Sequence, residues 1–132
     1  MIFGIGTDIV VIERLERLLE GHGRRTAEKI LADAEMADYD MAARPAAHLA
    51  KRFAAKEALG KALGLGLRAP ATLHNIAVSH DEIGRPSFVC APPLAAWLAE
   101  RRLTLHLSIS DEAGTAIAFV IAEQPPTAAD EA

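Results

Sequence analysis

The segment TAIAFVIAE, residues 115–123, is apolar on both faces of the strand that it predicts. Successive residues of a strand point to opposite sides of the sheet. One face carries small or β-branched residues, Ala116, Ala118 and Val120. The other face carries larger ones, Ile117, Phe119 and Ile121. Because sheets of small two-layer domains commonly leave one polar face to solvent, this strand must be covered twice. Helices of its own chain can cover one face, and the sheet of a neighbouring subunit would serve for the other.

The remaining pattern predicts an α+β domain, in which a small and mainly antiparallel sheet packs against helices. Strands are predicted over residues 2–10, 75–79, 86–90, 103–109 and 115–123. Leu or Ile alternates with polar residues over 103–109, which predicts a half-buried strand. We expect this strand and the last one to form a hairpin across Asp111 to Gly114. Helices are predicted over residues 11–20, about 26–41, 46–63 and 92–102. We expect one domain over residues 1–123 and a disordered polar tail over 124–132.

The composition excludes several classes of protein. Lys and Arg total 14 against 18 Asp and Glu, and this net charge of −4 argues against a nucleic-acid binder, although a local basic patch is compatible with it. The single cysteine, Cys90, excludes an intramolecular disulfide framework and a thiolate zinc cluster, and it suits a reducing compartment. No apolar run approaches the ~18 residues of a membrane span, and no signal peptide is visible. A cytoplasmic location without membrane contact is therefore expected.

Asp8 is the first residue with a possible chemical role. On the predicted strand it shares a face with Gly4 and Gly6, so open space is expected beside its carboxylate. A bulky ligand or a metal ion could use that space. Alternatively, Asp8 caps the helix that follows, and the glycines serve a β-bulge. The pattern alone favours this second interpretation.

The helix predicted over 46–63 places charges among apolar neighbours. Glu57 and Lys61 lie four residues apart on one face, whereas Lys56 points into a sector that otherwise looks buried and therefore needs a partner or a ligand. Asp8 and Glu57 could share a hard divalent cation, with Lys61 reaching a phosphate beside it. The pattern alone favours a surface ion pair between Glu57 and Lys61. It also favours a helix-capping role for Gly64.

Four blocks of sequence, in this order, carry a family resemblance. They are GIGTDIVVIERLER from Gly4, RFAAKEALGKALGLG from Arg52, GRP at 84–86 and LSISDE at 107–112. Together they resemble the holo-acyl-carrier-protein synthases, the small 4′-phosphopantetheinyl transferases, over residues 1 to about 123. The combination of G-x-D with F-x-x-K-E-x-x-x-K is specific. It reverses the preference that the pattern alone gave at Asp8, Glu57 and Lys61.

The resemblance implies a function in fatty acid biosynthesis. The chain would move 4′-phosphopantetheine from coenzyme A to a serine of apo-acyl carrier protein, releasing adenosine 3′,5′-bisphosphate. Asp8 and Glu57 would hold Mg²⁺ against the pyrophosphate, and Lys61 would contact the same region. The serine proton would pass to Glu57, a metal-bound hydroxide or a water, and the sequence leaves that choice open. The candidate contacts with coenzyme A are Arg52, Lys56, Lys61, Gly64, Gly84, Pro86, Ser108 and Ser110.

The resemblance also implies a homotrimer with coenzyme A at each subunit interface. The neighbouring subunit would supply the blocks at Gly84–Pro86 and Ser108–Ser110. Arginines of the first helix and the turn after it would form a basic patch for the acidic carrier protein, namely Arg14, Arg17, Arg24 and Arg25. Many relatives have His where this chain has Asp111, which weakens any mechanism that requires that histidine.

Two other functions remain as alternatives. The chain could be a non-catalytic module that binds coenzyme A or a nucleotide, but the joint presence of Asp8, Glu57 and Lys61 argues against this. It could also act on carrier domains of polyketide or peptide synthases. The length of 132 residues favours the short trimeric type over the double-length transferases that usually serve those substrates.

Overall fold

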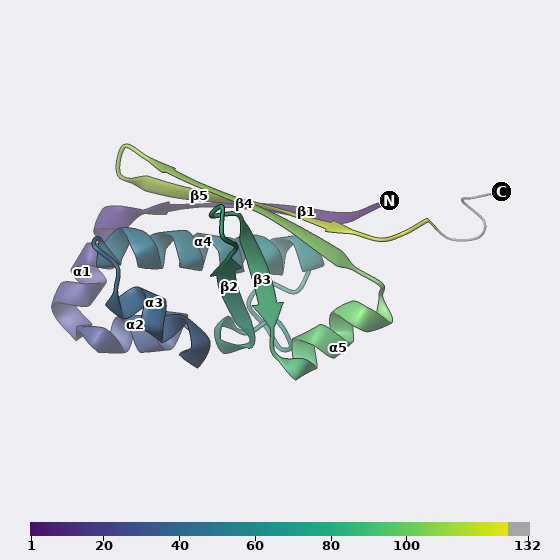
Figure 1. The fold of residues 1–132 in the computed structure, drawn as a ribbon, viewed down its shortest axis with the longest axis horizontal. Helices are drawn as coiled ribbons and strands as arrows, with labels where there is room; N and C mark the ends of the chain where they lie inside the picture. Colours follow the sequence, from purple (N-terminus) through teal and green to yellow (C-terminus); the bar gives the residue numbers. More distant parts are fainter. Residues whose placement is uncertain (127–132) are drawn as a thin grey trace.

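Two antiparallel sheets and one long helix organise the computed structural model, which describes residues 1–126 (Figure 1). The larger sheet has the order β1-β5-β4 and consists of β1 (Ile2–Val11), β4 (Thr104–Glu112) and β5 (Thr115–Glu123). The smaller sheet is the hairpin of β2 (Ile76–His80) and β3 (Pro86–Cys90). The predicted α+β class, the antiparallel pairing and the hairpin of the last two strands are confirmed.

The helices follow the predicted pattern except in one region. α1 (Ile12–His22), α4 (Pro45–Leu63) and α5 (Pro92–Glu100) form at the expected places. The single helix expected over 26–41 is wrong, because the chain breaks there into α2 (Arg24–Ile30), the 3-10 turn η1 (Asp33–Glu35) and α3 (Met36–Asp40). Leu31 and Ala32 adopt extended backbone at the break, and the Glu35 side chain accepts the N–H of Ala32. A second 3-10 turn, η2 (Leu73–Asn75), precedes β2.

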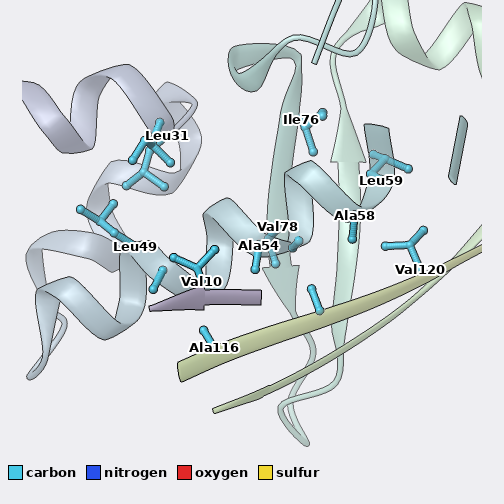
Figure 2. Close-up of a cluster of buried hydrophobic side chains, with 14 of the residues drawn as sticks. Val10, Leu31, Leu49, Ala54, Ala58, Leu59, Ile76, Val78, Ala116 and Val120 are labelled. Carbon is cyan, nitrogen blue, oxygen red and sulfur yellow. The ribbon is translucent and has the colours of Figure 1, made fainter. Parts of the chain in front are cut away.

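α4 packs directly under the three-stranded sheet, and all helices lie on that side of it (Figure 1). The buried face of β5 presents Ala116, Ala118, Val120 and Ala122 to the helix. Figure 2 shows Ala54 and Ala58 of α4 close to this layer. Because small side chains face each other across the contact, the helix backbone comes close to the sheet.

The approach is closest at two glycines of β1. A Cβ atom built on Gly4 would lie 1.9 Å from the carbonyl oxygen of Ala62, and one on Gly6 would lie 2.0 Å from that of Ala58. The expectation of open space for a ligand beside Asp8 is therefore wrong at these positions, because α4 fills that space. The glycines bring the strand into contact with the helix.

The opposite face of the larger sheet is apolar and uncovered in the single chain. Ile5 and Ile9 of β1 are 60% and 63% exposed, and Ile117 and Phe119 of β5 are 44% and 40% exposed. One face of β5 is thus covered by its own helix, as predicted, whereas the other has no cover within residues 1–126.

The two ends of the described chain are held together. The N–H of Gln124 donates to the carbonyl of Met1, and the Met1 ammonium donates to the carbonyl of Gln124. Most of the disordered tail predicted over 124–132 falls on residues 127–132, which lie outside the described residues. The boundary of the domain at 123 stays a prediction. Over residues 1–126, the helices are too short or too polar to cross a bilayer.

Candidate active site

The site begins where β1 meets α4. Asp8 lies on the inner face of β1 with Gly4 and Gly6, and its side chain is 18% exposed. Lys61 of α4 reaches across to it: its ammonium lies 3.2 Å from Asp8 Oδ1 and donates to the carbonyl oxygen of Thr7 at 2.9 Å. The pattern alone favoured Lys61 as a surface partner of Glu57 and Asp8 as a helix cap. The structure instead pairs Lys61 with Asp8, in a contact between α4 and β1.

Glu57 completes the group one turn before Lys61 on α4. Partial burial and the negative charge of Asp8 raise the pKa of Glu57, whereas the charges of Lys61 and Arg14 lower it. The charge of Asp8 therefore reaches Glu57, which places the two carboxylates in the same site. Arg14 of α1 acts on the same carboxylate, so the first helix borders the site.

Two close carboxylates form a suitable pair of ligands for a hard divalent cation. Mg²⁺ is commonly held by one or two carboxylates, with waters and substrate phosphates as its other ligands. Within residues 1–126, no group of three or more His, Cys, Asp or Glu side chains is placed to hold a metal ion. Asp8 and Glu57 therefore fit a cation that depends on a phosphate-bearing ligand for the rest of its coordination.

Lys56 has a different role from the one predicted. It is fully buried, and its ammonium donates to Glu35 and to the carbonyl oxygens of Ile30 and Leu73. The expectation that Lys56 needs a partner is confirmed, but its proposed contact with coenzyme A is not supported, because all three donors are used inside the protein. Burial lowers the pKa of Lys56, and the charge of Glu35 opposes this shift.

Glu35 is the important residue that sequence reasoning missed. Its carboxylate is 1% exposed and pairs with both Lys56 and Arg52. The only signal in the sequence was the unpaired charge of Lys56 on a buried face. Nothing in the spacing points to Glu35 as its partner, because the two residues are brought together by the break after α2.

A cationic cleft of about 240 Å³ lies between α4, the β2–β3 hairpin and β4. Its lining consists of His48, Lys51, Arg52, His80, Gly84, Pro86, Ile109 and Asp111. Gly84, with φ of 83°, shapes the turn that brings Pro86 to the cleft. The structure thus places Gly84, Pro86 and Arg52 together within one chain. Arg52 is mostly committed to Glu35 and Val78, so Lys51 is the more accessible cation there.

Asp111 and His48 set the charge of this cleft. The carboxylate of Asp111 lies 3.8 Å from the ammonium of Lys51. Burial and the charges of Arg52 and Lys51 lower the pKa of His48 to about 4, so the imidazole is neutral at pH 7. The cleft therefore takes its positive charge from Lys51 and Arg52.

Ser108 and Ser110 lie away from this group. Both are exposed on β4, opposite Phe119 and Ile117 of β5, and so on the uncovered face of the larger sheet. Asp8 lies on the other face, so one chain does not bring these serines to Asp8. Gly64 ends α4 in a left-handed conformation, as the capping pattern predicts, and its contact with coenzyme A stays a prediction.

The four arginines expected to form a docking patch differ in their surroundings. Arg17 pairs with Glu13 at 2.7 Å, and Arg24 pairs with Asp40. Arg25 instead lines a wider cleft of about 620 Å³ between α1, α2 and α4. Its other lining residues are Leu18, His22, Thr26, Lys29, Ile30, Phe53 and Leu73. Phe53 lies one turn before Glu57 on α4, so this cleft adjoins the carboxylate pair.

Comparison with known proteins gives consistent matches over the whole described fold. A family model described as ACPS, 4′-phosphopantetheinyl transferase superfamily, matches residues 4–120. The holo-[acyl-carrier-protein] synthase of Aromatoleum aromaticum is 54% identical, covering 94% of this chain and 99% of that protein. The protein of the same name from Dechloromonas aromatica is also 54% identical, covering 93% and 98%.

Solved structures agree with these matches. The crystal structure of holo-[acyl-carrier-protein] synthase from Neisseria meningitidis has a TM-score of 0.90 and 46% identity, covering 94% of this chain and 100% of that one. The enzyme of Bacillus anthracis, solved in complex with CoA (3′,5′-ADP), has a TM-score of 0.80 and 32% identity, covering 95% and 99%. These proteins share both the fold and much of the sequence with this chain.

Proposed function

The chain belongs to the 4′-phosphopantetheinyl transferase superfamily, and from this membership we propose that it is a holo-[acyl-carrier-protein] synthase. It transfers the 4′-phosphopantetheine group of coenzyme A to a serine of apo-acyl carrier protein, and adenosine 3′,5′-bisphosphate is the second product. The observation that carries this proposal is the pair of carboxylates, Asp8 and Glu57, beside the ammonium of Lys61. The same three residues stand in the sequence blocks that resemble the family.

Asp8 and Glu57 are the proposed ligands of Mg²⁺. Their proximity supports this, because a cation would relieve the repulsion that contributes to the raised pKa of Glu57. When bound, such an ion neutralises charge on the pyrophosphate of coenzyme A. The chain contributes the carboxylates in a fixed arrangement, one from β1 and one from α4.

Phosphoryl-type transfer depends mainly on positioning and on neutralisation of charge. The serine oxygen of the carrier forms a bond with the β-phosphorus of coenzyme A, and the bond from that phosphorus to the bridging oxygen breaks. The serine proton passes to a base at the site, either Glu57 or a water. Lys61 is half exposed at 52%, so its ammonium can turn from Asp8 toward a phosphate oxygen. A positive charge at that point stabilises the leaving bisphosphate.

The cationic cleft is the proposed site for the phosphate-rich end of coenzyme A. Lys51 and Arg52 supply the charge, and Gly84 and Pro86 form the opposite wall. The wider cleft of Arg25, Lys29 and Phe53 adjoins Glu57 on the other side, and it combines apolar and basic groups. This combination suits an acidic carrier protein that presents its serine at the carboxylate pair.

A homotrimer is the proposed assembly. Ile5, Ile9, Ile117 and Phe119 form an apolar patch that an association between subunits would bury. Ser108 and Ser110 lie on the same face, so a neighbouring subunit could bring them to the site of the next. Light scattering should give about three times 14.1 kDa, and a stable, active monomer would contradict the assembly.

A cytoplasmic location is also proposed. The support is the free Cys90, which suits a reducing compartment. Burial raises the pKa of its thiol to about 11, so it is unreactive at neutral pH.

Mass spectrometry tests the proposed reaction directly. Apo-carrier protein incubated with the enzyme, coenzyme A and MgCl₂ should gain the mass of phosphopantetheine on one serine. Excess EDTA or Asp8→Ala should prevent the gain, since either removes part of the proposed cation site. A chain that binds coenzyme A but leaves the carrier mass unchanged would be a binding module and not a transferase.

A further inference from the structure

We propose that Glu35 is a positioning residue for coenzyme A: its buried carboxylate anchors the β2–β3 hairpin to α4 and so fixes the width of the cationic cleft. The inference rests on the proposed function, because it assumes that the cleft binds coenzyme A. Among the described residues, Glu35 does not itself line the cleft and makes no hydrogen bond to Asp8 or Glu57; it acts through Arg52, which does line the cleft, and through Val78.

The carboxylate of Glu35 accepts four hydrogen bonds. Oε1 accepts from the N–H of Ala32 at 2.9 Å and from the ammonium of Lys56 at 2.5 Å. Oε2 accepts from the guanidinium of Arg52 and from the N–H of Val78, both at 3.0 Å. Burial raises the pKa of this carboxyl, but Lys56 and the backbone donors reverse the effect and lower it overall. The group therefore stays ionised and joins η1, α4 and β2.

The contact with β2 substitutes for a neighbouring strand. The N–H of Val78 donates to Glu35, and the carbonyl oxygen of Val78 accepts from Arg52. A further strand on this edge would use these same two groups. A buried pair of side chains thus attaches the hairpin to the body of the protein at its central residue.

The attachment matters because the hairpin forms one wall of the cleft. His80, Gly84 and Pro86 belong to the hairpin and its turn, whereas Lys51 and Arg52 belong to α4. A two-stranded hairpin is only marginally stable by itself. Its position relative to α4 therefore depends on anchors such as Glu35, and the same anchor orients Arg52.

Glu35→Gln should weaken the hydrogen bonds that hold the hairpin to α4, and it keeps the size of the side chain. The amide has one accepting oxygen where the carboxylate has two, so its NH₂ group meets either Ala32 and Lys56 or Val78 and Arg52, all of which are donors. The hairpin should then move away from α4. Glu35→Asp keeps the charge but is one methylene shorter, so it cannot reach both sets of donors at their present positions.

Steady-state kinetics on the full chain test the inference. Relative to the wild type, Glu35→Gln should raise the KM for coenzyme A on the order of tenfold, with the KM for carrier protein and kcat at saturating coenzyme A within about twofold. Glu35→Asp should raise the same KM about threefold, and it decides the question if the Gln variant does not fold. Leu98→Ala, a core change on α5 away from the cleft, is the control for general destabilisation.

A second readout is independent of turnover. Calorimetric affinity for adenosine 3′,5′-bisphosphate should fall in both Glu35 variants and stay unchanged in Leu98→Ala. Folded Glu35 variants with wild-type affinity and an unchanged KM for coenzyme A would overturn the positioning role, as would an equal rise in both KM values. If wild type itself shows no transfer, the proposed function fails, whereas the calorimetric comparison still decides the role of Glu35.

Discussion

Replacing Gly6 with alanine should separate β1 from α4 and thereby disturb the carboxylate pair. The added Cβ would lie 2.0 Å from the carbonyl oxygen of Ala58, whereas ordinary contact begins at 3.4 Å. The strand and the helix must therefore move apart by about 1.4 Å, the difference between these two distances. Backbone atoms of α4 form this contact, so no side chain can turn away to relieve it.

The displacement should affect both stability and activity. Overpacking of this kind costs roughly 1–3 kcal/mol of unfolding free energy. For a chain of this size that corresponds to a fall in Tm of about 3–15 °C. Asp8 lies two residues further along the same face of β1, and a misplacement of about 1 Å at a reacting group can reduce the rate by ~100-fold. Thermal scans and the mass-spectrometric transfer assay measure the two effects.

Gly21→Ala is the matched control for this prediction. A Cβ on Gly21 would meet nothing within 4 Å, and the residue lies inside α1. Alanine should therefore leave Tm unchanged or raise it, because the free energy of unfolding increases by at most about 1 kcal/mol. If Gly6→Ala kept both the Tm and the transfer rate of the wild type, the close approach of β1 and α4 would not be what positions Asp8.

Three further predictions concern charge. Because burial and Asp8 raise the pKa of Glu57, the fold loses stability as pH rises and Glu57 ionises, so Glu57→Gln should raise Tm at pH 7 without Mg²⁺ and abolish transfer. Added MgCl₂ should raise Tm only in the wild type, and an equal response of both proteins would mean that the pair binds no cation. Arg25→Glu should raise the KM for carrier protein in a salt-dependent way and leave the KM for coenzyme A nearly unchanged. Arg17→Glu should raise the KM for carrier protein less, since Arg17 is already paired with Glu13, and equal effects of the two changes would argue against the wider cleft as the docking site. Because the pKa of His48 is lowered to about 4, the unfolded state takes up its proton first, and the wild type should lose stability as pH falls from about 6.5 toward 4. Urea unfolding should show a smaller loss in His48→Phe, and equal losses in both proteins would mean that His48 is not the titrating group.

The sequence predicted most of the regular structure because its signals there are local. Period-2 alternation marks β4, and the glycines after α1 and α4 mark the helix ends. The carboxylate pair was found through two short motifs. Lys56 was expected to need a partner because its direction on the helix follows from spacing alone.

Long-range geometry explains what the sequence left out. The break after α2 arises because Leu31 is buried and Glu35 turns inward to α4 and β2, which no local pattern contains. The space beside Asp8 looked open because glycine lacks a side chain, yet the packing partner is the backbone of α4, which periodicity cannot reveal. Arg52 looked available to a ligand until its acceptors on Glu35 and Val78 were located.

The attachment of the hairpin through Val78 also protects the protein against aggregation. An exposed strand edge can recruit a strand of another molecule, and natural sheets usually block such edges. Here two buried side chains occupy the central donor and acceptor of β2, so another chain finds no free pair of groups at that residue. A loss of Glu35 would therefore expose the edge of β2 to pairing with another chain, and it would also release one wall of the cationic cleft. Variants at this position should show reduced solubility at high concentration, even where their folded fraction is still active.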